Sequence, residues 1–230
     1  MSLSPVPIAP RTFVIGDIHG CAATLRRLVD GMLQPSTPDR IYLLGDLIDR
    51  GPDSKGVLDF IFELRERGLY IESIRGNHEE MFLNSCDDPH YLGLWLANGG
   101  MATLSSFRAD GPGDIPQRYR DFIGSLPLYI LLDDFVLVHA SLNFDTKDPF
   151  NDTAAMLWMR SPFVDRLRIG GRRLICGHTP VSRTQLGASL GSDKIMLDNG
   201  CVFFDRPEPG NLAALELSAM TLFLCPNIDR

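Results

Sequence analysis

The sequence predicts an α/β protein in which a sandwich of two mixed β-sheets is flanked by helices. The first half alternates short apolar strands with amphipathic helices, an order typical of a parallel sheet with right-handed crossovers. The second half contains further strand candidates with little helix between them. Three strands in front and about six behind are more than one sheet comfortably holds. We therefore expect two packed sheets in a single domain, residues 12–230, after a mobile proline-rich tail, residues 1–11.

Hydrophobic spacing places the individual elements. Apolar residues recur at helical spacing over 21–32 and over 57–64, and Gly68 closes the second of these helices. Residues 79–125 look helical and interrupted, with a loop around 111–113. A hairpin is expected where two apolar runs flank Asp133 and Asp134. The strands are expected at 12–15, 40–44, 69–74, 128–132, 135–139, 173–176, 194–197, 212–217 and 221–224.

Composition narrows the class of protein and its partners. The chain has 230 residues, 44% of them hydrophobic, which suffices for a sizeable core. No apolar stretch reaches the ~20 residues that span a bilayer and no signal peptide is evident, so we expect no membrane partner. The 5 cysteines are widely spaced without C-x-x-C, which favours a reduced, cytoplasmic protein. The net charge of −7 argues against a nucleic-acid partner, and the oligomeric state stays open.

Polar residues follow five of the strand candidates where each strand ends. In open α/β sheets, ligands bind at the carboxyl ends of the strands. In four of the five cases a glycine lies beside the polar residue, and glycine lets the backbone turn sharply and a ligand approach closely. The five segments are Gly16-Asp17-Ile18-His19-Gly20, Gly45-Asp46-Leu47-Ile48-Asp49-Arg50-Gly51, Gly76-Asn77-His78-Glu79, His139-Ala140 and Gly177-His178-Thr179.

The residue types in these segments predict a pair of metal ions. Asp17 and His19 are two residues apart, so in an extended segment they point the same way and can hold one ion. Nitrogen and oxygen donors without thiolate suit Mn²⁺, with Fe and Zn²⁺ as alternatives. Two ions about 3.5–4 Å apart activate a shared hydroxide for direct in-line attack on a phosphoester. The second ion is expected on Asn77, His139 and His178, with Asp46 bridging the pair.

The remaining residues fit a displacement at phosphorus. His78 is adjacent to a metal donor but is not assigned to metal, so it can protonate the leaving oxygen. Asp49 is the carboxylate expected to hold this imidazole in its tautomer and protonated. Arg50 offers a guanidinium fork for phosphate oxygens, and Arg160 is expected to be a second clamp. Asn77 is also expected to contact the substrate phosphate.

Each residue also has an ordinary structural interpretation. Asp49 or Asp53 can cap a helix, His139 can be a hydrogen-bonded core residue, and Arg160 can form a surface ion pair on a helix. Taken together, these structural interpretations do not explain why the polar residues cluster at the strand ends. Four of the 5 histidines lie in the five segments, all at expected strand ends. Only His90 lies outside, and we expect it to be structural.

The ordered set of five motifs resembles the phosphoprotein phosphatase branch of the calcineurin-like metallophosphoesterases, over roughly residues 12–217. The resemblance implies a four-layer fold with a β-sandwich between helices and a dinuclear metal centre. It assigns Asp17, His19 and Asp46 to one ion. It assigns Asp46, Asn77, His139 and His178 to the other. It also implies that His78 and Asp49 are the general-acid pair and that Arg50 and Arg160 bind phosphate.

The chain departs from the family pattern at a few positions. Ser141 stands after His139-Ala140 where glycine is usual, and Leu47 replaces an aromatic residue of the eukaryotic enzymes. The chain is also shorter than those enzymes, so it looks most similar to the compact bacterial and phage serine/threonine phosphatases. Asp198-Asn199-Gly200 resembles the family's late Asp-Thr-Gly segment, and we expect a structural role for it.

The resemblance leaves two catalytic functions and one non-catalytic function. The first is a metal-dependent phosphomonoesterase that acts as a serine/threonine protein phosphatase on phosphoproteins or small phosphoesters. The second is a symmetrical diadenosine tetraphosphate hydrolase, a group that commonly has Ala and Asp where this chain has Asp49 and Glu79. We therefore favour the phosphatase. A non-catalytic metal-binding or interaction module would lack ligands or the acid, and none is missing here.

Overall fold

The computed structural model describes residues 9–203 and 210–229. Most of the expected tail, residues 1–8, lies outside the described residues. Its last residue, Arg11, is held by Asp39, whose carboxylate accepts hydrogen bonds from the backbone N–H and the guanidinium of Arg11. Residues 9–11 of the expected tail are therefore described, and Arg11 is anchored to the fold.

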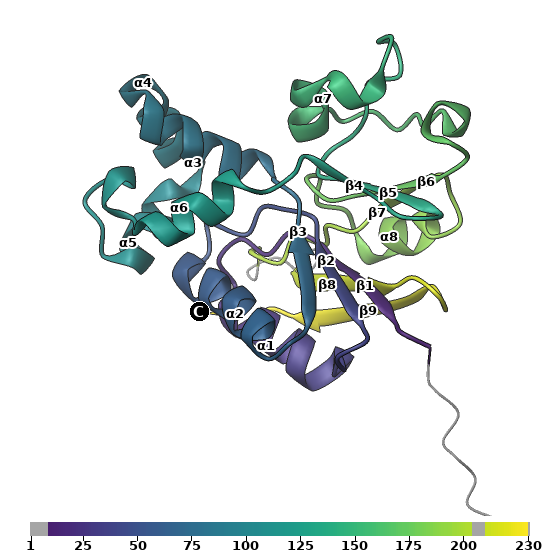
Figure 1. Cartoon of the computed structure of the whole chain (residues 1–230), viewed down its shortest axis with the longest axis horizontal. Helices are drawn as coiled ribbons and strands as arrows, with labels where there is room; N and C mark the ends of the chain where they lie inside the picture. Colours follow the sequence, from purple (N-terminus) through teal and green to yellow (C-terminus); the bar gives the residue numbers. More distant parts are fainter. Residues whose placement is uncertain (1–8, 204–209, 230) are drawn as a thin grey trace, which may run out of the picture.

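Two mixed β-sheets face each other, as the sequence predicts (Figure 1). Strands β1, β2 and β3 are parallel, and β8 and β9 extend the same sheet in antiparallel fashion in the order β3-β2-β1-β8-β9. The second sheet has the order β4-β5-β6-β7, in which only the β4–β5 hairpin is antiparallel. The strands are β1 Thr12–Ile15, β2 Arg40–Leu43, β3 Tyr70–Ser73, β4 Tyr129–Leu131, β5 Phe135–Val138, β6 Arg173–Cys176, β7 Lys194–Met196, β8 Asn211–Glu216 and β9 Thr221–Pro226.

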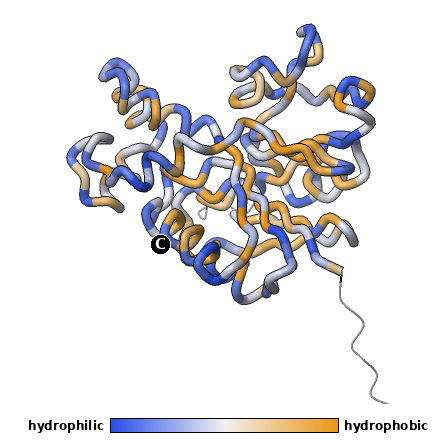
Figure 2. Tube along the Cα trace, viewed as in Figure 1, coloured by the Kyte–Doolittle hydropathy of each residue, from blue (hydrophilic) through white to orange (hydrophobic). Residues whose placement is uncertain are grey.

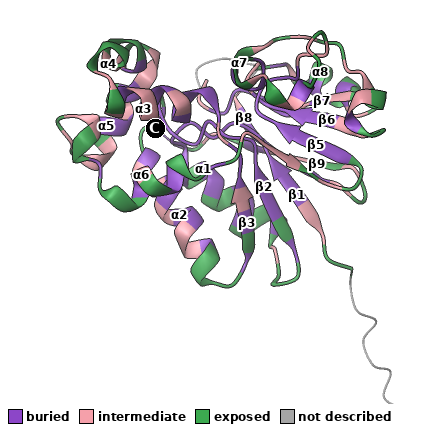
Figure 3. Cartoon of the chain, turned by 45° about the horizontal axis from the view of Figure 1, so that its top comes forward, coloured by how far each residue is buried: buried purple, intermediate pink, exposed green. Residues whose placement is uncertain are grey.

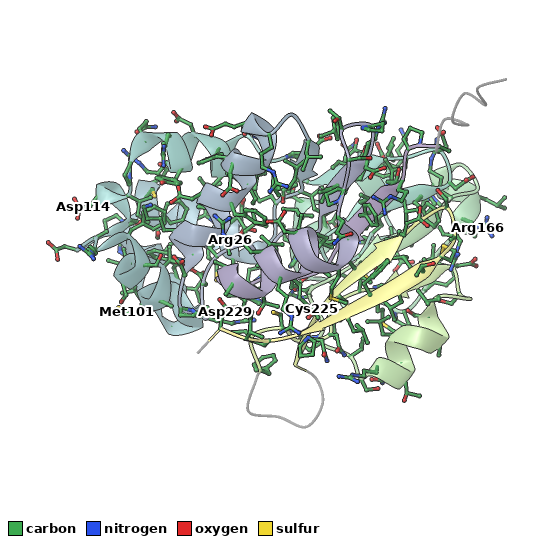
Figure 4. The ribbon with its side chains drawn as sticks, turned by 90° about the horizontal axis from the view of Figure 1, so that it is seen from below. Arg26, Met101, Asp114, Arg166, Cys225 and Asp229 are labelled. Carbon is green, nitrogen blue, oxygen red and sulfur yellow. The ribbon has the colours of Figure 1, made fainter. Side chains whose placement is uncertain are left out.

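Helices of the first half cover the outer face of the five-stranded sheet. α1 (Ala22–Arg26) continues as a π-helical segment η1 (Arg27–Leu33), and α2 spans Ser54–Glu66. The side chain of Asp53 caps α2, and Gly68 ends the segment in the left-handed conformation with a φ of +79°. Cys21 provides no side-chain cap for α1. Instead Asp229, near the other end of the chain, accepts hydrogen bonds from the N–H groups of its first turn (Figure 4).

A helical lobe occupies the middle of the chain, beside the sandwich (Figure 1). The expectation that helix begins at residue 79 is wrong by two residues, since α3 already begins at Asn77. The expected loop around 111–113 contains a 3₁₀ turn. The elements are α3 Asn77–Asp87, α4 Pro89–Trp95, η2 Leu96–Gly100, α5 Met101–Phe107, η3 Pro112–Asp114 and α6 Gln117–Gly124.

Short helices lie against the four-stranded sheet. They are η4 Pro149–Asn151, α7 Thr153–Trp158, η5 Arg166–Ile169 and α8 Arg183–Ser189. Leu186 of α8 packs with the residues between the two sheets. Met156 of α7 and Ile169 of η5 pack against the outer face of this sheet. The layers are therefore helix, sheet, sheet and helix, which is the architecture that the resemblance implies. No helix in the described part of the chain is long and apolar enough to cross a membrane.

Strand periodicity divides the core into layers. In β1, Val14 faces the second sheet, whereas Phe13 and Ile15 face the helices α1 and α2. Figure 2 shows the apolar residues concentrated along the strands, and Figure 3 shows that most of the strands are buried. Loops at the strand ends can carry polar residues because the sandwich beneath them already holds the fold together.

Candidate metal and catalytic site

The loops after β1, β2, β3, β5 and β6 meet at one edge of the sandwich. The N–H groups of Ile18 and His19 donate to the carbonyl of Asp46, at 3.1 and 2.8 Å. In the other sheet, the N–H of Gly177 donates to the carbonyl of His139 at 2.9 Å. These backbone bonds hold loops from distant parts of the sequence next to one another, as the parallel strand order predicts.

The Asp46 carboxylate lies at the centre of the site. Its Oδ2 is 3.5 Å from His19 Nε2, and its Oδ1 is 3.5 Å from His139 Nε2. Two groups of metal-ligand atoms share this carboxylate: His19, Asp46 and His78 in one, and Asp46, His139 and His178 in the other. Within each group the ligand atoms lie within 4.8 Å of one another. One carboxylate between two clusters is the geometry expected of a bridging ligand.

The histidines are oriented as metal ligands are. His19 Nδ1 donates to the carbonyl of Ile48 at 3.1 Å, and His139 Nδ1 donates to the carbonyl of Leu44 at 2.8 Å. Such bonds leave the Nε2 lone pair free for an ion. Burial lowers the pKa of both imidazoles, and burial together with His139 lowers the pKa of His178 to about 3. Neutral imidazoles are the form that binds a cation.

Potential metal-ligand atoms of Asn77, His139 and His178 lie close together. Asn77 Oδ1 lies 2.9 Å from both His139 Nε2 and His178 Nδ1. Because His139 donates from Nδ1, its Nε2 lone pair faces the Asn77 oxygen. Three potential ligand atoms at these separations are close enough together to bind one ion. The donor set of two imidazoles, an amide oxygen and a carboxylate fits Mn²⁺, Fe or Zn²⁺.

Asp17 contributes a buried oxygen with no partner. Its Oδ2 accepts the N–H of His178 at 2.9 Å, while Oδ1 has no hydrogen-bond partner among the described residues. A Cβ on Gly177 would lie 1.9 Å from Oδ1, so glycine is required there. Burial and the charges of Asp198 and Asp46 raise the pKa of Asp17. A buried oxygen with this acidic surrounding fits a cation ligand.

The geometric reason given for pairing Asp17 with His19 is wrong. His19 has a φ of +47°, so the chain turns there and the segment is not extended. Neither group of ligand atoms described above contains Asp17. Their joint binding of one ion stays a prediction that rests on the converging loops rather than on strand periodicity.

Left-handed backbone is concentrated in this site. Non-glycine residues rarely adopt positive φ, and such strain persists where surrounding contacts enforce it, often at functional sites. Among the described residues eight non-glycine positions have positive φ, and five of them are predicted site residues. These five are His19, Asp46, Asp49, Arg50 and His178.

His78 and Asp49 form a buried pair. His78 Nδ1 lies 2.8 Å from Asp49 Oδ2. Burial opposes protonation of His78, but the charges of Asp46 and Asp49 outweigh it and raise the pKa of the imidazole. Its Nε2 has no hydrogen-bond partner in the described structure and lies 4.0 Å from Asp46 Oδ2. A proton on Nε2 would thus lie next to the predicted metal ligands, where the predicted acid is expected.

Two residues that sequence reasoning missed hold Asp49 in place. Trp95 Nε1 donates to Asp49 Oδ2 at 2.9 Å, and Thr103 Oγ1 donates to Oδ1 at 2.6 Å. Asp53, not Asp49, caps the following helix. Trp95 and Thr103 come from the helical lobe, where no motif marks them. Only their position in the fold connects them with the site.

Glu79 is a further residue that sequence reasoning did not place in the site. Its buried carboxylate accepts the N–H groups of Asp46, Leu47 and Gly76, each at 2.8 Å, and that of Ile48 at 3.3 Å. Burial and the Asp46 charge raise its pKa to about 7. It therefore joins the loop after β2 to the start of α3. Glu79 is the third residue of α3, a position from which Glu commonly accepts the backbone N–H of the N-cap residue, so the sequence offered a signal for this contact.

The two arginines lie at the rim. Arg50 Nη1 is 2.8 Å from His19 Nε2, and its backbone N–H donates to Gly99 of the helical lobe. Arg160 is exposed and follows α7, so the expectation that it lies on a helix is wrong. It is close enough for its charge to act on His178. No ion pair of Arg160 occurs among the residues that the structure describes.

The other two structural expectations concern His90 and the Asp198 segment. His90 is exposed and contacts Asp88 at the beginning of α4, and it belongs to neither group of ligand atoms. Asp198 accepts the N–H of Gly200 at 2.7 Å, and burial raises its pKa to about 7. Asn199 donates to the carbonyl of Val181. These contacts join the end of the second sheet to its neighbours and support a structural role.

Residues 10–199 match the sequence profile of the family described as Calcineurin-like phosphoesterase. The chain is 43% identical over 205 residues to Serine/threonine-protein phosphatase 1 of Salmonella typhimurium, covering 83% of this chain and 87% of that protein. It is 27% identical over 246 residues to the asymmetrical Bis(5'-nucleosyl)-tetraphosphatase PrpE of Geobacillus thermodenitrificans, covering 93% of each.

Solved structures share the fold. A protein serine/threonine phosphatase from Saccharomyces cerevisiae, with similarity to human phosphatase PP5, aligns with a TM-score of 0.67 and 15% identity over 96% of this chain and 81% of that one. A metallophosphoesterase from Sphaerobacter thermophilus aligns with a TM-score of 0.58 and 17% identity, over 96% and 89%. At these identities the likeness concerns the fold alone.

Proposed function

The chain belongs to the calcineurin-like phosphoesterase family, and from this premise we propose that it is a serine/threonine protein phosphatase dependent on two divalent metal ions. The observation that carries the proposal is the Asp46 carboxylate shared between two groups of possible ligand atoms, one of which also contains His78 of the His78–Asp49 pair. The 43% identical bacterial relative supports the substrate class.

The residues that would hold the ions are those the sequence predicts. Asp17, His19 and Asp46 would bind one ion, and Asp46, Asn77, His139 and His178 the other. We propose Mn²⁺ as the metal, because the donors are oxygen and imidazole without thiolate. When bound, the ions supply positive charge to the phosphate and lower the pKa of an attacking water.

The side chains of the chain itself do the rest. Arg50, Arg160 and the Asn77 amide bind phosphate oxygens and orient phosphorus for in-line attack. His78 gives the proton on Nε2 to the leaving serine or threonine oxygen, which would otherwise depart as a poor alkoxide leaving group. Asp49 holds the imidazole in the orientation and charge that this transfer needs.

Two further features bear on the wider proposal. All five cysteines, each among the described residues, are free, which supports a reducing, cytoplasmic location. The proposal disfavours a non-catalytic module, because a degenerate member would lack predicted ligands or the acid pair, and the sequence contains all of them. Negligible turnover of any phosphoester by fully metallated protein would revive that alternative.

A symmetrical diadenosine tetraphosphate hydrolase is the second candidate. It is supported by the symmetrical Bis(5'-nucleosyl)-tetraphosphatase of Chromobacterium violaceum, which is 24% identical over 276 residues, covering 93% of this chain and 94% of that protein. Against it stands Asp49, which pairs with His78 where that group commonly has alanine. The two functions separate when Mn²⁺-loaded protein is assayed on a phosphoserine peptide and on diadenosine tetraphosphate. We expect faster turnover of the peptide. Efficient release of ADP without dephosphorylation of the peptide would reverse the assignment.

A further inference from the structure

A hollow of about 310 Å³ adjoins the candidate active site. Gly177 belongs to both, because it lines the hollow and also lies against the Asp17 carboxylate. The next residue, His178, is a predicted metal ligand. A substrate whose phosphate reaches the ligand clusters therefore has its neighbouring atoms beside this hollow. The lining residues are Arg160, Ser161, Pro162, Cys176, Gly177, Thr179, Lys194 and Met196.

The lining carries two cations and no carboxylate. The ammonium of Lys194, at the start of β7, donates to the carbonyl of Ser161 at 2.7 Å and to the hydroxyl of Ser141 at 3.3 Å. Both acceptors are neutral, so the charge of Lys194 is not cancelled. Arg160 lies at the rim without an ion pair among the described residues. This arrangement is notable in a chain with a net charge of −7.

The acidic residues near the hollow are engaged elsewhere. Asp193 precedes Lys194 but pairs with Arg166 at 3.4 Å, on the outer edge of the molecule (Figure 4). Asp17 and Asp198 are buried, and their carboxylates accept the N–H groups of His178 and Gly200. An anion that entered the hollow would meet uncompensated positive charge, while Pro162 and Met196 would contact its aliphatic part.

We propose that this hollow binds the carboxylate of an acidic residue that flanks the phosphorylated residue of a protein substrate, with Lys194 as the residue that sets this specificity. The inference rests on the proposed protein phosphatase function and adds a sequence preference to it. A carboxylate fits this hollow because Lys194 and Arg160 supply positive charge there and the lining contains no set of metal ligands. The hollow is also large enough for one side chain.

The experiment compares phosphoserine peptides that carry Glu or Gln at each position within three residues of the phosphoserine. For the unmodified protein we expect kcat/KM to be about fivefold to tenfold higher with Glu at one of these positions, and this ratio to fall as salt is raised. In Lys194→Met the ratio should fall to about 1, and in Lys194→Arg it should be retained. The ratio is measured within one protein preparation, so partial misfolding does not change it.

Two controls isolate the charge of the hollow. Lys147→Met removes the charge of an exposed lysine that does not line the hollow, and should leave the ratio unchanged. The kcat/KM for p-nitrophenyl phosphate, which has no flanking residue, should change less than about twofold in Lys194→Met. Phosphopeptide turnover with no preference at any position, or a preference that survives Lys194→Met, overturns this inference alone. Turnover of diadenosine tetraphosphate but of no phosphopeptide overturns the proposed function, and this inference with it.

Discussion

At the scale of single residues, the site depends on what each side chain does with its second polar atom. His19 and His139 each use Nδ1 on a backbone carbonyl, and His78 uses Nδ1 on Asp49. In every case Nε2 is left to face the centre of the site. The difference lies in charge: burial lowers the pKa of the first two imidazoles, whereas two carboxylates raise that of His78. Three identical side chains therefore differ in charge, as their proposed roles of metal ligand and acid require.

Replacing His78 with Asn tests the acid role. We expect kcat to fall by ~10²–10⁴, the range for loss of general acid catalysis, while bound metal is retained. The loss should be much smaller for aryl phosphates, whose leaving groups need no proton. Phosphopeptide and aryl phosphate kinetics, with metal analysis, measure this. The exposed His90→Asn is the matched control and should change nothing; an equal loss across leaving groups would rule out the acid role.

Replacing Asp46 with Asn tests the bridging role. Because this carboxylate is shared by both ligand clusters, we expect the variant to lose both ions and therefore all activity. Metal content after gel filtration measures it. Asp53→Asn, which alters only the cap of α2, should keep its metal. Two ions per chain in the Asp46 variant would contradict the assignment.

At the scale of elements, the site is made by loops that other elements hold. The loop after β2 carries Asp46 and Asp49, and Glu79 at the start of α3 binds four of the N–H groups around it. The helical lobe adds the bonds from Trp95 and Thr103. The helix α1 that follows His19 is capped by Asp229 from the far end of the chain. Each loop is thus fixed by an element distant in sequence.

Replacing Glu79 with Gln tests this support. One carboxylate oxygen becomes an amide NH₂ that faces two buried N–H donors, so we expect the free energy of unfolding of the metal-free protein to fall by about 2–4 kcal/mol. Metal affinity should fall too, because Asp46 loses its anchor. Urea unfolding and Mn²⁺ titration measure both. The control is Glu80→Gln, at the next position in the sequence, where the carboxylate pairs with the partly exposed Arg75. This substitution should lower the free energy of unfolding by under about 1 kcal/mol. Equal effects of the two substitutions would contradict the support role.

At the scale of the whole molecule, stability depends on contacts that close the ends of the sheets. Asp39 precedes β2 and is buried, and it accepts hydrogen bonds from Arg11 before β1 and from the N–H of Ser36. Although burial opposes ionisation, these bonds lower the pKa of Asp39 to about 2, from an ordinary 3.8. A depressed carboxyl pKa stabilises the folded state above the unfolded pKa, and this stabilisation is lost as the pH falls through the folded pKa.

Replacing Asp39 with Asn should therefore lower stability in a pH-dependent way. At ~1.4 kcal/mol per pH unit, the lowered pKa corresponds to about 2 kcal/mol at neutral pH, and the difference from the unmodified protein should shrink between about pH 4 and pH 2. Urea unfolding across this range measures it. The control is Asp30→Asn, which removes one member of the exposed ion pair between Asp30 and Arg67. It should lower the free energy of unfolding by under about 1 kcal/mol. A difference that is constant with pH would contradict the ionic origin.

Much of the fold and site was predictable because its signals are local. The alternation of Val14 with Phe13 and Ile15 records which face of β1 meets which layer, and the strands of both halves were predicted from such patterns. The five motifs could be read because glycine and a polar residue follow strand after strand. The geometry of Asp17 and His19 was wrong because a positive φ at His19 leaves no trace in periodicity.

By itself, the sequence determined the strand and helix order, the residue types at the strand ends and therefore the chemical class of the site. Only the tertiary structure decided that Asp46 lies between two clusters, that Glu79, Trp95 and Thr103 support it, and that Lys194 lies in a hollow beside His178. The physical reason is the separation, along the sequence, of the residues in contact. Periodicity and capping are set by neighbours a few residues away, whereas these contacts join residues tens of positions apart and exist only once the two sheets have packed.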